Sequence, residues 1–188
     1  MLFRSVYKCL QSCRPSPWQA FLSRKVGTWL MADHPYNWEW SQQLEDSLRT
    51  MLGKAGLRCA TAVHKSWANA WTTSSRMDED VCLPCIFGCN DEDDELSHYL
   101  CCDTLWTAAI SNVSPRVELL RCSPYQRLCL SQPSLENARL LALVFSCYHA
   151  IKLAHRDLVD KCVADKDFLD VQVKLMALAL AFKKDMTG

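Results

Sequence analysis

Glycine and proline are scarce in this sequence, which contains five glycines and seven prolines among its 188 residues. Disordered and low-complexity chains are typically rich in these residues and poor in apolar ones, whereas 49 % of this chain is hydrophobic. The composition therefore excludes a largely disordered chain. It favours a folded one with a substantial core, and the length suits one domain of ordinary size.

An excess of charge of one sign is also missing. The 21 basic and 21 acidic residues give a formal net charge of zero. This balance excludes a generally basic nucleic-acid binder, because such proteins neutralise phosphates with many lysines and arginines. Any contact with nucleic acid has to come from a local basic patch.

The sequence lacks an apolar run long enough to span a bilayer. The longest stretch, from about Leu140 to Ile151, is interrupted by Ser146 and His149 and is shorter than the roughly 20 residues that a span needs. No N-terminal stretch has the apolar core and cleavage site of a secretory signal peptide. We therefore interpret the scattered cysteines as reduced thiols in a reducing compartment, the nucleus or the cytoplasm.

The N-terminal segment has no acidic residue before Asp33, and Pro15 and Pro17 would interrupt a long helix within it. We expect residues 1–37 to form a basic leader or an irregular segment, and residues 38–188 to form the folded domain. The composition of the leader resembles a mitochondrial transit peptide, so the mitochondrion is the alternative location. A weakly structured leader on a fragment fits equally well. Its basic residues are Arg4, Lys8, Arg14, Arg24 and Lys25.

Helical spacing of apolar residues dominates the rest of the chain, and no run alternates convincingly with the period of a strand. Ser41 is placed to cap a first helix, and Gly53 and Gly56 end it. A second helix is predicted from about Leu57 to Trp71. Its apolar stripe is expected to lie in the core and consists of Leu57, Ala60, His64, Trp67 and Trp71.

The C-terminal half is also predicted to be helical. Asp103 or Thr104 can cap a short helix that carries Leu105 and Trp106, and Ser134 opens a long helix that runs through Leu158. Asp165 or Asp167 can cap a last helix. The apolar face of that helix consists of Phe168, Val171, Leu175 and Leu178. The sequence thus predicts an all-α domain with a central loop region, at about residues 82–106, stapled by one metal ion.

The spacing of cysteine and histidine in that loop region carries the clearest chemical signal. Cys85 and Cys89 are separated by three residues, His98 follows after eight more, and Cys102 follows after another three. Three thiolates and one imidazole suit a tetrahedral zinc ion. Four residues separate His98 from Cys102, so both would lie on one face if a helix begins there. We predict that these four residues are the zinc ligands.

Two neighbouring cysteines leave the choice of ligands open. Cys82 with Cys85 makes an alternative pair, and Cys101 could replace Cys102. A cluster of reduced, buried thiols is a further alternative, because free cysteine packs well as a small hydrophobe. Between the two halves of the site, the acidic run of residues 91–95 is expected to be a solvated loop.

The same stretch resembles the zinc-knuckle region on the C-terminal side of reverse transcriptases from non-LTR (LINE-type) retrotransposons. The resemblance lies in Cys85 and Cys89, in the segment from Glu95 through His98 to Cys102, and in Leu105 and Trp106. Residues 66–77 also resemble the helix and loop that precede the knuckle in that family. The resemblance covers roughly residues 40–110, and residues 130–160 look plausible as the helical tail.

This resemblance implies that Cys85, Cys89, His98 and Cys102 hold the metal, and that the region assists nucleic-acid handling during target-primed reverse transcription. The Tyr/Phe-x-Asp-Asp signature of the polymerase does not occur in this chain. The carboxylates that hold the catalytic magnesium ions are therefore missing, and so is a recognisable endonuclease motif. We expect no enzymatic activity from this chain on its own.

Two functions remain as predictions. The first is a retroelement-derived zinc module that binds RNA or single-stranded DNA through a basic surface formed by Lys54, Arg58, Lys65 and Arg76. Trp67 or Trp71 would stack on bases only if exposed. The second is a structural subunit of a larger assembly, possibly mitochondrial, in which protein partners cover exposed apolar side chains. Exposure of the face from Leu175 to Leu180 would favour the second function.

Overall fold

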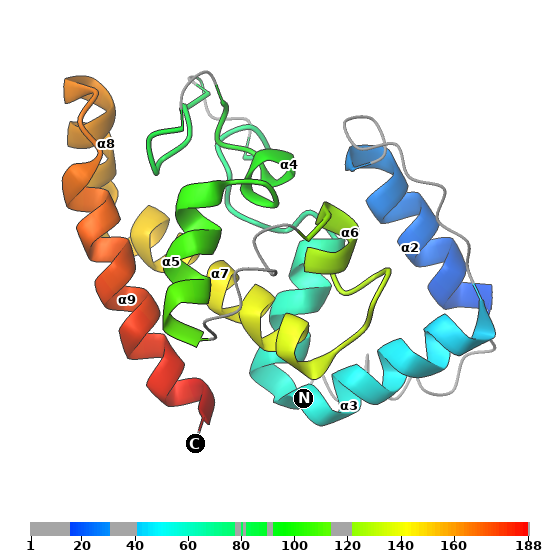
Figure 1. Ribbon diagram of the computed structural model, residues 1–188. Helices are drawn as coiled ribbons and strands as arrows, with labels where there is room; N and C mark the ends of the chain where they lie inside the picture. The colour runs from blue at the N-terminus through cyan, green and yellow to red at the C-terminus, as the bar shows by residue number, and fades with distance from the viewer. Residues whose placement is uncertain are drawn as a thin grey trace.

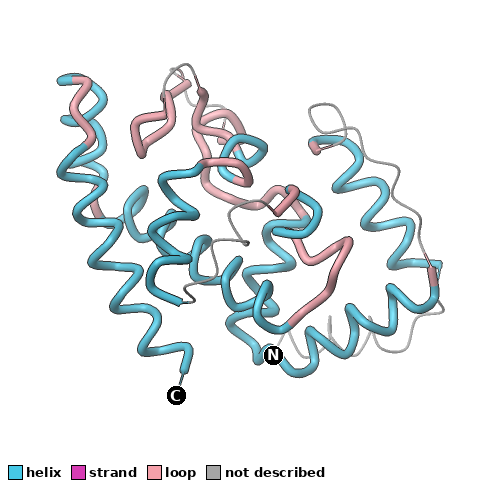
Figure 2. The backbone as a smooth tube through the Cα atoms, viewed as in Figure 1, coloured by secondary structure: helices cyan, strands magenta, loops and turns pink. Residues whose placement is uncertain are grey.

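The computed structural model describes residues 16–30, 41–77, 80, 82–89, 92–113 and 122–187. Figure 2 shows that these residues form helices joined by loops. No strand occurs within the described ranges, where a single isolated bridge pairs Pro84 with Asp93. The prediction of an all-α fold is therefore confirmed.

The central element is α7 (Leu135–Ala154), against which α3 (Gln42–Trp67), α5 (Asp103–Val113) and α9 (Leu169–Thr187) pack (Figure 1). Ser134 caps α7, as the sequence predicts, because its hydroxyl accepts a hydrogen bond from the backbone N–H of Asn137 at 3.0 Å. Residues Leu140 to Val144 are all buried, so this part of the helix is covered on every side. A helix in this position must be apolar around most of its circumference.

Helix α3 joins the two helices that the sequence predicts separately. The predicted cap is confirmed, since the hydroxyl of Ser41 accepts from the N–H of Leu44 at 3.1 Å. Gly56 has φ 74° and ψ 163°, a conformation that glycine adopts readily, and it kinks the helix instead of ending it. Helix α3 ends at Trp67, so the prediction that the helix extends to Trp71 is wrong.

The core stripe predicted for residues 57–71 is confirmed at three of its five positions. Ala60, Trp67 and Trp71 are buried, and His64 is half-buried. Leu57 is 74 % exposed, so its placement in the core is wrong. The physical reason is the non-helical turn at Gly56, which rotates the next residue away from the direction that continuous helical spacing assigns to it.

Part of the predicted leader is helical. Helix α2 (Ser16–Trp29) packs against α3, and Leu22, Val26 and Leu30 are fully buried. Their spacing of four residues is that of one helix face. The expectation of an irregular segment is therefore wrong for residues 16–29, whereas the role of residues 1–37 as a leader stays a prediction.

The helix that Ser134 opens is shorter than the sequence predicts. Helix α7 ends at Ala154, not at Leu158, and α8 (Arg156–Asp165) follows it directly. Lys166 then adopts a left-handed conformation, with φ 54°, which ends α8. The carboxylate of Asp167 accepts from the N–H of Leu169 at the start of α9, at 3.1 Å. Among the described residues, no helix is both long and apolar enough to cross a membrane.

A buried carboxylate ties the loop region to the helices. Asp94 has no exposed surface, and its Oδ2 lies 2.6 Å from the ammonium of Lys152, which is itself buried in α7. The N–H of Ser74 also donates to Oδ2, at 2.7 Å, and the hydroxyls of Tyr99 and Tyr148 donate to Oδ1, at 2.7 and 3.0 Å. The expectation that the whole acidic run is solvated is therefore wrong at Asp94. Glu92 and Asp93 are exposed, as expected.

We expect Asp94→Asn to lower the free energy of unfolding by about 3–5 kcal/mol, because the ammonium of Lys152 would lose its counter-charge inside the core. Urea unfolding followed by circular dichroism measures the change. The matched control is Asp93→Asn at the exposed neighbour, which should alter the stability by no more than about 0.5 kcal/mol. Equal urea midpoints for the two variants would contradict the role of this ion pair.

Candidate metal centre

A short hairpin carries the first two predicted ligands. The N–H of Cys85 donates to the carbonyl of Glu92 at 2.7 Å, and the N–H of Asp94 donates to the carbonyl of Leu83 at 2.8 Å. The N–H of Gly88 closes a turn on the carbonyl of Cys85 at 3.1 Å. This turn reverses the chain between Cys85 and Cys89, so that both sulfurs face the same point.

Gly88 holds the hairpin against the start of α9. Its φ of 83° lies in the left-handed region, which favours glycine. A Cβ atom at this position would lie 2.7 Å from Cγ of Phe168, closer than side chains approach in folded proteins. The amide of Gln172 in α9 also donates to the carbonyl of Phe87 at 2.9 Å. Only glycine therefore permits this contact between the hairpin and α9.

The other two predicted ligands lie on successive short elements. His98 belongs to α4 (Leu96–Tyr99), and Cys102 directly precedes α5, where its carbonyl accepts from the N–H of Trp106 at 3.1 Å. No single helix carries both residues, because α4 ends at Tyr99. The turn between α4 and α5 brings the two side chains together instead.

The structure brings all four predicted ligands into one group. The ligand atoms of Cys85, Cys89, His98 and Cys102 all lie within 4.8 Å of one another, and this group could hold a metal ion. The sulfurs of Cys89 and Cys102 are 3.6 Å apart. Cys89 is half-buried and the other three are buried. That these residues bind a metal stays a prediction.

The alternative ligands lie outside this group. Cys82 and Cys101 are both exposed, and the sulfur of Cys82 lies 3.8 Å from the hydroxyl of Ser74. Although Cys101 as a whole is exposed, partial desolvation of its thiol raises the pKa of that group, which disfavours the thiolate that a metal needs. The geometry therefore favours Cys85 and Cys102 over their neighbours in the sequence.

The orientation of His98 fits a metal ligand. Its Nε2 atom is buried without a hydrogen-bond partner, whereas its Nδ1 atom lies 3.3 Å from the carboxylate of Glu92. A buried ring nitrogen without a partner costs free energy unless another group, such as a metal, binds it. Histidine ligands usually donate their second N–H to a carboxylate or carbonyl, which fixes the ring and raises its basicity. Glu92 occupies the place of such a partner.

The electrostatics of the group favour a cation at its centre. A hydrogen bond from the Cys102 thiol lowers the pKa of Cys85 to about 4 and also lowers the pKa of Cys89. Hydrogen bonds to Cys85 and Cys89 in turn raise the pKa of Cys102. Burial lowers the pKa of His98, but contact with the sulfur of Cys85 outweighs it and raises that pKa to about 9. Negative charge thus gathers at the sulfurs.

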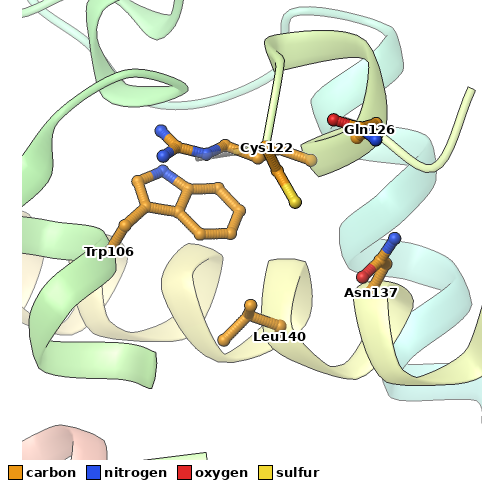
Figure 3. A pocket seen from close by; sticks show the side chains of 6 residues that line it. Trp106, Cys122, Gln126, Asn137 and Leu140 are labelled. Atoms are coloured by element: carbon orange, nitrogen blue, oxygen red, sulfur yellow. The ribbon is translucent and has the colours of Figure 1, made fainter. Parts of the chain in front are cut away.

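The wall of the site next to α5 is closely packed. Arg127, in α6 (Pro124–Arg127), places its guanidinium 4.6 Å from the ring centroid of Trp106 and donates to the carbonyl of Leu100. Figure 3 shows Trp106 facing Cys122 and Leu140. The cavity that these side chains line has a volume of about 10 Å³. This volume has room for about one water molecule, whereas ligand sites occupy several hundred Å³. The cavity is therefore not a substrate site.

Comparisons with known proteins name no relative. The chain matches no protein-family model, no curated protein and no solved structure.

The four predicted nucleic-acid-binding residues are all exposed, but they do not form one surface. The ammonium of Lys65 lies 5.5 Å from the ring centroid of Phe145, and Arg76 donates to the carbonyl of Trp71 at 3.5 Å. The ring centroids of Trp71 and Phe145 are 5.6 Å apart. Trp71 therefore connects Arg76, which binds its carbonyl, to the ring beside Lys65.

The other two basic residues, Arg58 and Lys54, lie nearer the start of α3 than Lys65 does. Arg58 places its guanidinium 5.7 Å from the ring centroid of Phe182, near the end of α9. Lys54 lies on the other side of the Gly56 kink. It lines an open cleft of about 600 Å³ together with Asp46 and Ser134. The structure therefore groups Lys65 with Arg76 and separates Lys54 from them.

Neither predicted stacking residue is accessible. Trp67 and Trp71 have no exposed surface, and their indole N–H groups donate to the carbonyl of Leu128 and the hydroxyl of Ser66. Two half-buried rings lie beside Lys65 instead. Phe145 and His149 in α7 pack with their centroids 4.0 Å apart. This pair is not among the residues that the sequence predicts to bind nucleic acid, although a separation of four residues places the two rings on one helix face.

We expect Cys89→Ala to lose the metal, and Cys101→Ala to retain it, because only Cys89 directs its sulfur at the other ligands. Elemental analysis of the purified variants measures the metal content per chain. Glu92→Gln should retain the metal but bind it roughly 10-fold more weakly, as is usual when the carboxylate partner of a histidine ligand is removed. Metal retained at full occupancy in Cys89→Ala would contradict the ligand assignment.

Proposed function

We propose that this chain is a non-catalytic zinc module, related to the zinc-knuckle region of non-LTR retrotransposon reverse transcriptases, that binds single-stranded nucleic acid. The convergence of Cys85, Cys89, His98 and Cys102 on one point carries the proposal. Soft thiolates with one imidazole suit zinc better than calcium or magnesium, which prefer oxygen ligands. When bound, zinc supplies folding free energy to the hairpin and to α4.

The site supports a structural role for the metal. Catalytic zinc sites typically have three protein ligands and leave one position for water or substrate. Here the four side chains would fill the coordination sphere of a bound zinc ion, and the Nε2 atom of His98 is buried without a hydrogen-bond partner. A closed site of this kind joins the hairpin to α4 and to the start of α5, and it activates no substrate.

The nucleic-acid surface is centred on Lys65 and Arg76. Basic side chains that alternate with accessible rings are typical of proteins that bind single strands, because phosphates pair with the cations and bases stack on the rings. Phe145 and His149 supply half-buried rings next to Lys65. Burial lowers the pKa of His149, so its ring is neutral near pH 7 and contributes a stacking surface more than charge.

Removal of the metal should destabilise the hairpin before the helices. With free zinc at a thousand times the dissociation constant, binding contributes about 4 kcal/mol to stability. We therefore expect a zinc chelator to lower the urea midpoint and to expose residues 82–102 to proteolysis, while α3 and α7 retain most of their helical signal. Added zinc should restore the midpoint and added magnesium should not. An unchanged midpoint after complete removal of zinc would contradict the structural role.

Charge reversal should abolish nucleic-acid binding. We expect Lys65→Glu with Arg76→Glu to eliminate the binding of a labelled single-stranded RNA or DNA, and the affinity of the unmodified chain to fall as salt increases. Fluorescence anisotropy measures both effects. Lys161→Glu, at an exposed lysine of α8, is the matched control and should retain binding. Equal affinity for the double variant and the control would contradict this surface.

A ring variant separates stacking from charge. Phe145→Leu keeps an apolar side chain against Trp71 and removes the ring beside Lys65. If bases stack there, affinity should fall by about 1–3 kcal/mol with little change in the salt dependence.

The second candidate function is that of a subunit in a larger assembly. One observation favours it. Helix α9 exposes a row of large apolar side chains, including Met176 and Leu180 on the face that the sequence analysis singled out for an interface.

A further inference from the structure

Helix α9 has two apolar faces, and only one of them contributes to the core. Val171, Leu175 and Ala179 are buried against the rest of the chain, where α9 packs on α5, α7 and α8. Leu169, Val173, Met176 and Leu180 are exposed by 63, 62, 44 and 51 %. We call these four residues the α9 stripe. Residues 175–182 contain no polar side chain. A helix that is apolar all round is normally covered on all sides.

The spacing within the α9 stripe specifies the shape of what covers it. Successive members are four, three and four residues apart. This is the spacing of the a and d positions of a coiled coil, which pack against a second α-helix. The stripe extends over twelve residues, and its two ends lie about 16 Å apart along the helix. Helix α9 also lies along one side of the molecule (Figure 1), so a second helix can approach it.

We propose that the α9 stripe pairs with the α9 stripe of a second copy of this chain, with the two helices antiparallel. The four positions are symmetric about the midpoint between Lys174 and Leu175. An antiparallel pair therefore places Leu169 opposite Leu180, and Val173 opposite Met176, twice over. A two-fold interface requires a surface that is complementary to itself in this way.

Charge at the two ends of α9 selects the antiparallel orientation. The turn before the helix and its first residues are net acidic, with Asp165, Asp167 and Asp170 outnumbering Lys166. The C-terminal end of the sequence is net basic, with Lys183 and Lys184 outnumbering Asp185. Antiparallel helices bring the acidic end of one chain to the basic end of the other, whereas parallel helices bring like charges together.

Sedimentation equilibrium of the zinc-loaded full chain, from low to high micromolar concentration, tests the proposal. We expect the unmodified chain to form a dimer. The variant with Val173→Lys and Met176→Lys should dimerise at least roughly 100-fold more weakly, because each lysine would face a lysine of the other copy. Both side chains are exposed, so zinc content and circular dichroism should not change. Leu153→Lys is the matched control, since Leu153 is 64 % exposed and lies on α7.

A second variant tests the orientation. Val173→Lys with Met176→Glu places a lysine opposite a glutamate in an antiparallel pair, but lysine opposite lysine in a parallel pair. It should therefore dimerise more strongly than the double-lysine variant. A monomeric unmodified chain, or a double-lysine variant that dimerises like the control, would overturn the proposal. Equal weakness of the two double variants would overturn the antiparallel pairing.

Discussion

Four donors converge on the buried carboxylate of Asp94, and the position of the candidate metal centre depends on them. The N–H of Ser74 comes from the segment after α3, the hydroxyl of Tyr99 from α4, and Tyr148 and Lys152 from α7. A buried carboxylate is costly to desolvate unless its lone pairs and its charge are both satisfied. Here both oxygens are, so three separate parts of the chain are fixed around one group.

Tyr99 couples this ion pair to the ligands. Its hydroxyl donates to Asp94 and accepts from the N–H of Ile86 at 3.2 Å, so one side chain fixes both the interior of the hairpin and the helix that carries His98. Hydrogen bonds through Tyr99 therefore help to position the candidate ligands, independently of any metal. The packing of Tyr99 between Trp71, Phe87 and Tyr148 adds aromatic contacts on several sides.

Local chemistry made part of this structure predictable. Ser41 and Ser134 cap helices because a serine before an apolar helical repeat has a specific hydrogen-bonding role. The grouping of Cys85, Cys89, His98 and Cys102 was predictable for a similar reason, because cysteine and histidine at short spacing have few other uses. In both cases the interaction involves residues that are close in the sequence, so the pattern itself contains the information.

Two of the errors arose where residues distant in the sequence decide the outcome, and a third arose at a glycine that changes the course of the backbone. An acidic run usually points to solvent, and the sequence gives no sign that Lys152, 58 residues away, accompanies Asp94 into the core. Leu57 fits a helical stripe, but the turn at Gly56 directs it outward. Trp67 and Trp71 were candidates for stacking on bases, but both are buried. Their indole N–H groups donate to the carbonyl of Leu128 and to the hydroxyl of Ser66.

The contact between Gly88 and Phe168 joins the hairpin of the candidate metal centre to the start of α9, although the two residues are far apart in the sequence. Because a Cβ at position 88 would meet the ring of Phe168, the hairpin and the first turn of α9 must move together. If α9 pairs with a second copy and the hairpin holds zinc, the two binding equilibria share this contact. Thermodynamic reciprocity then requires that any strengthening of dimerisation by the metal be matched by tighter metal binding in the dimer. The absence of a Cβ atom at Gly88 would thus allow metal binding in the hairpin to change the fraction of the protein that is dimeric.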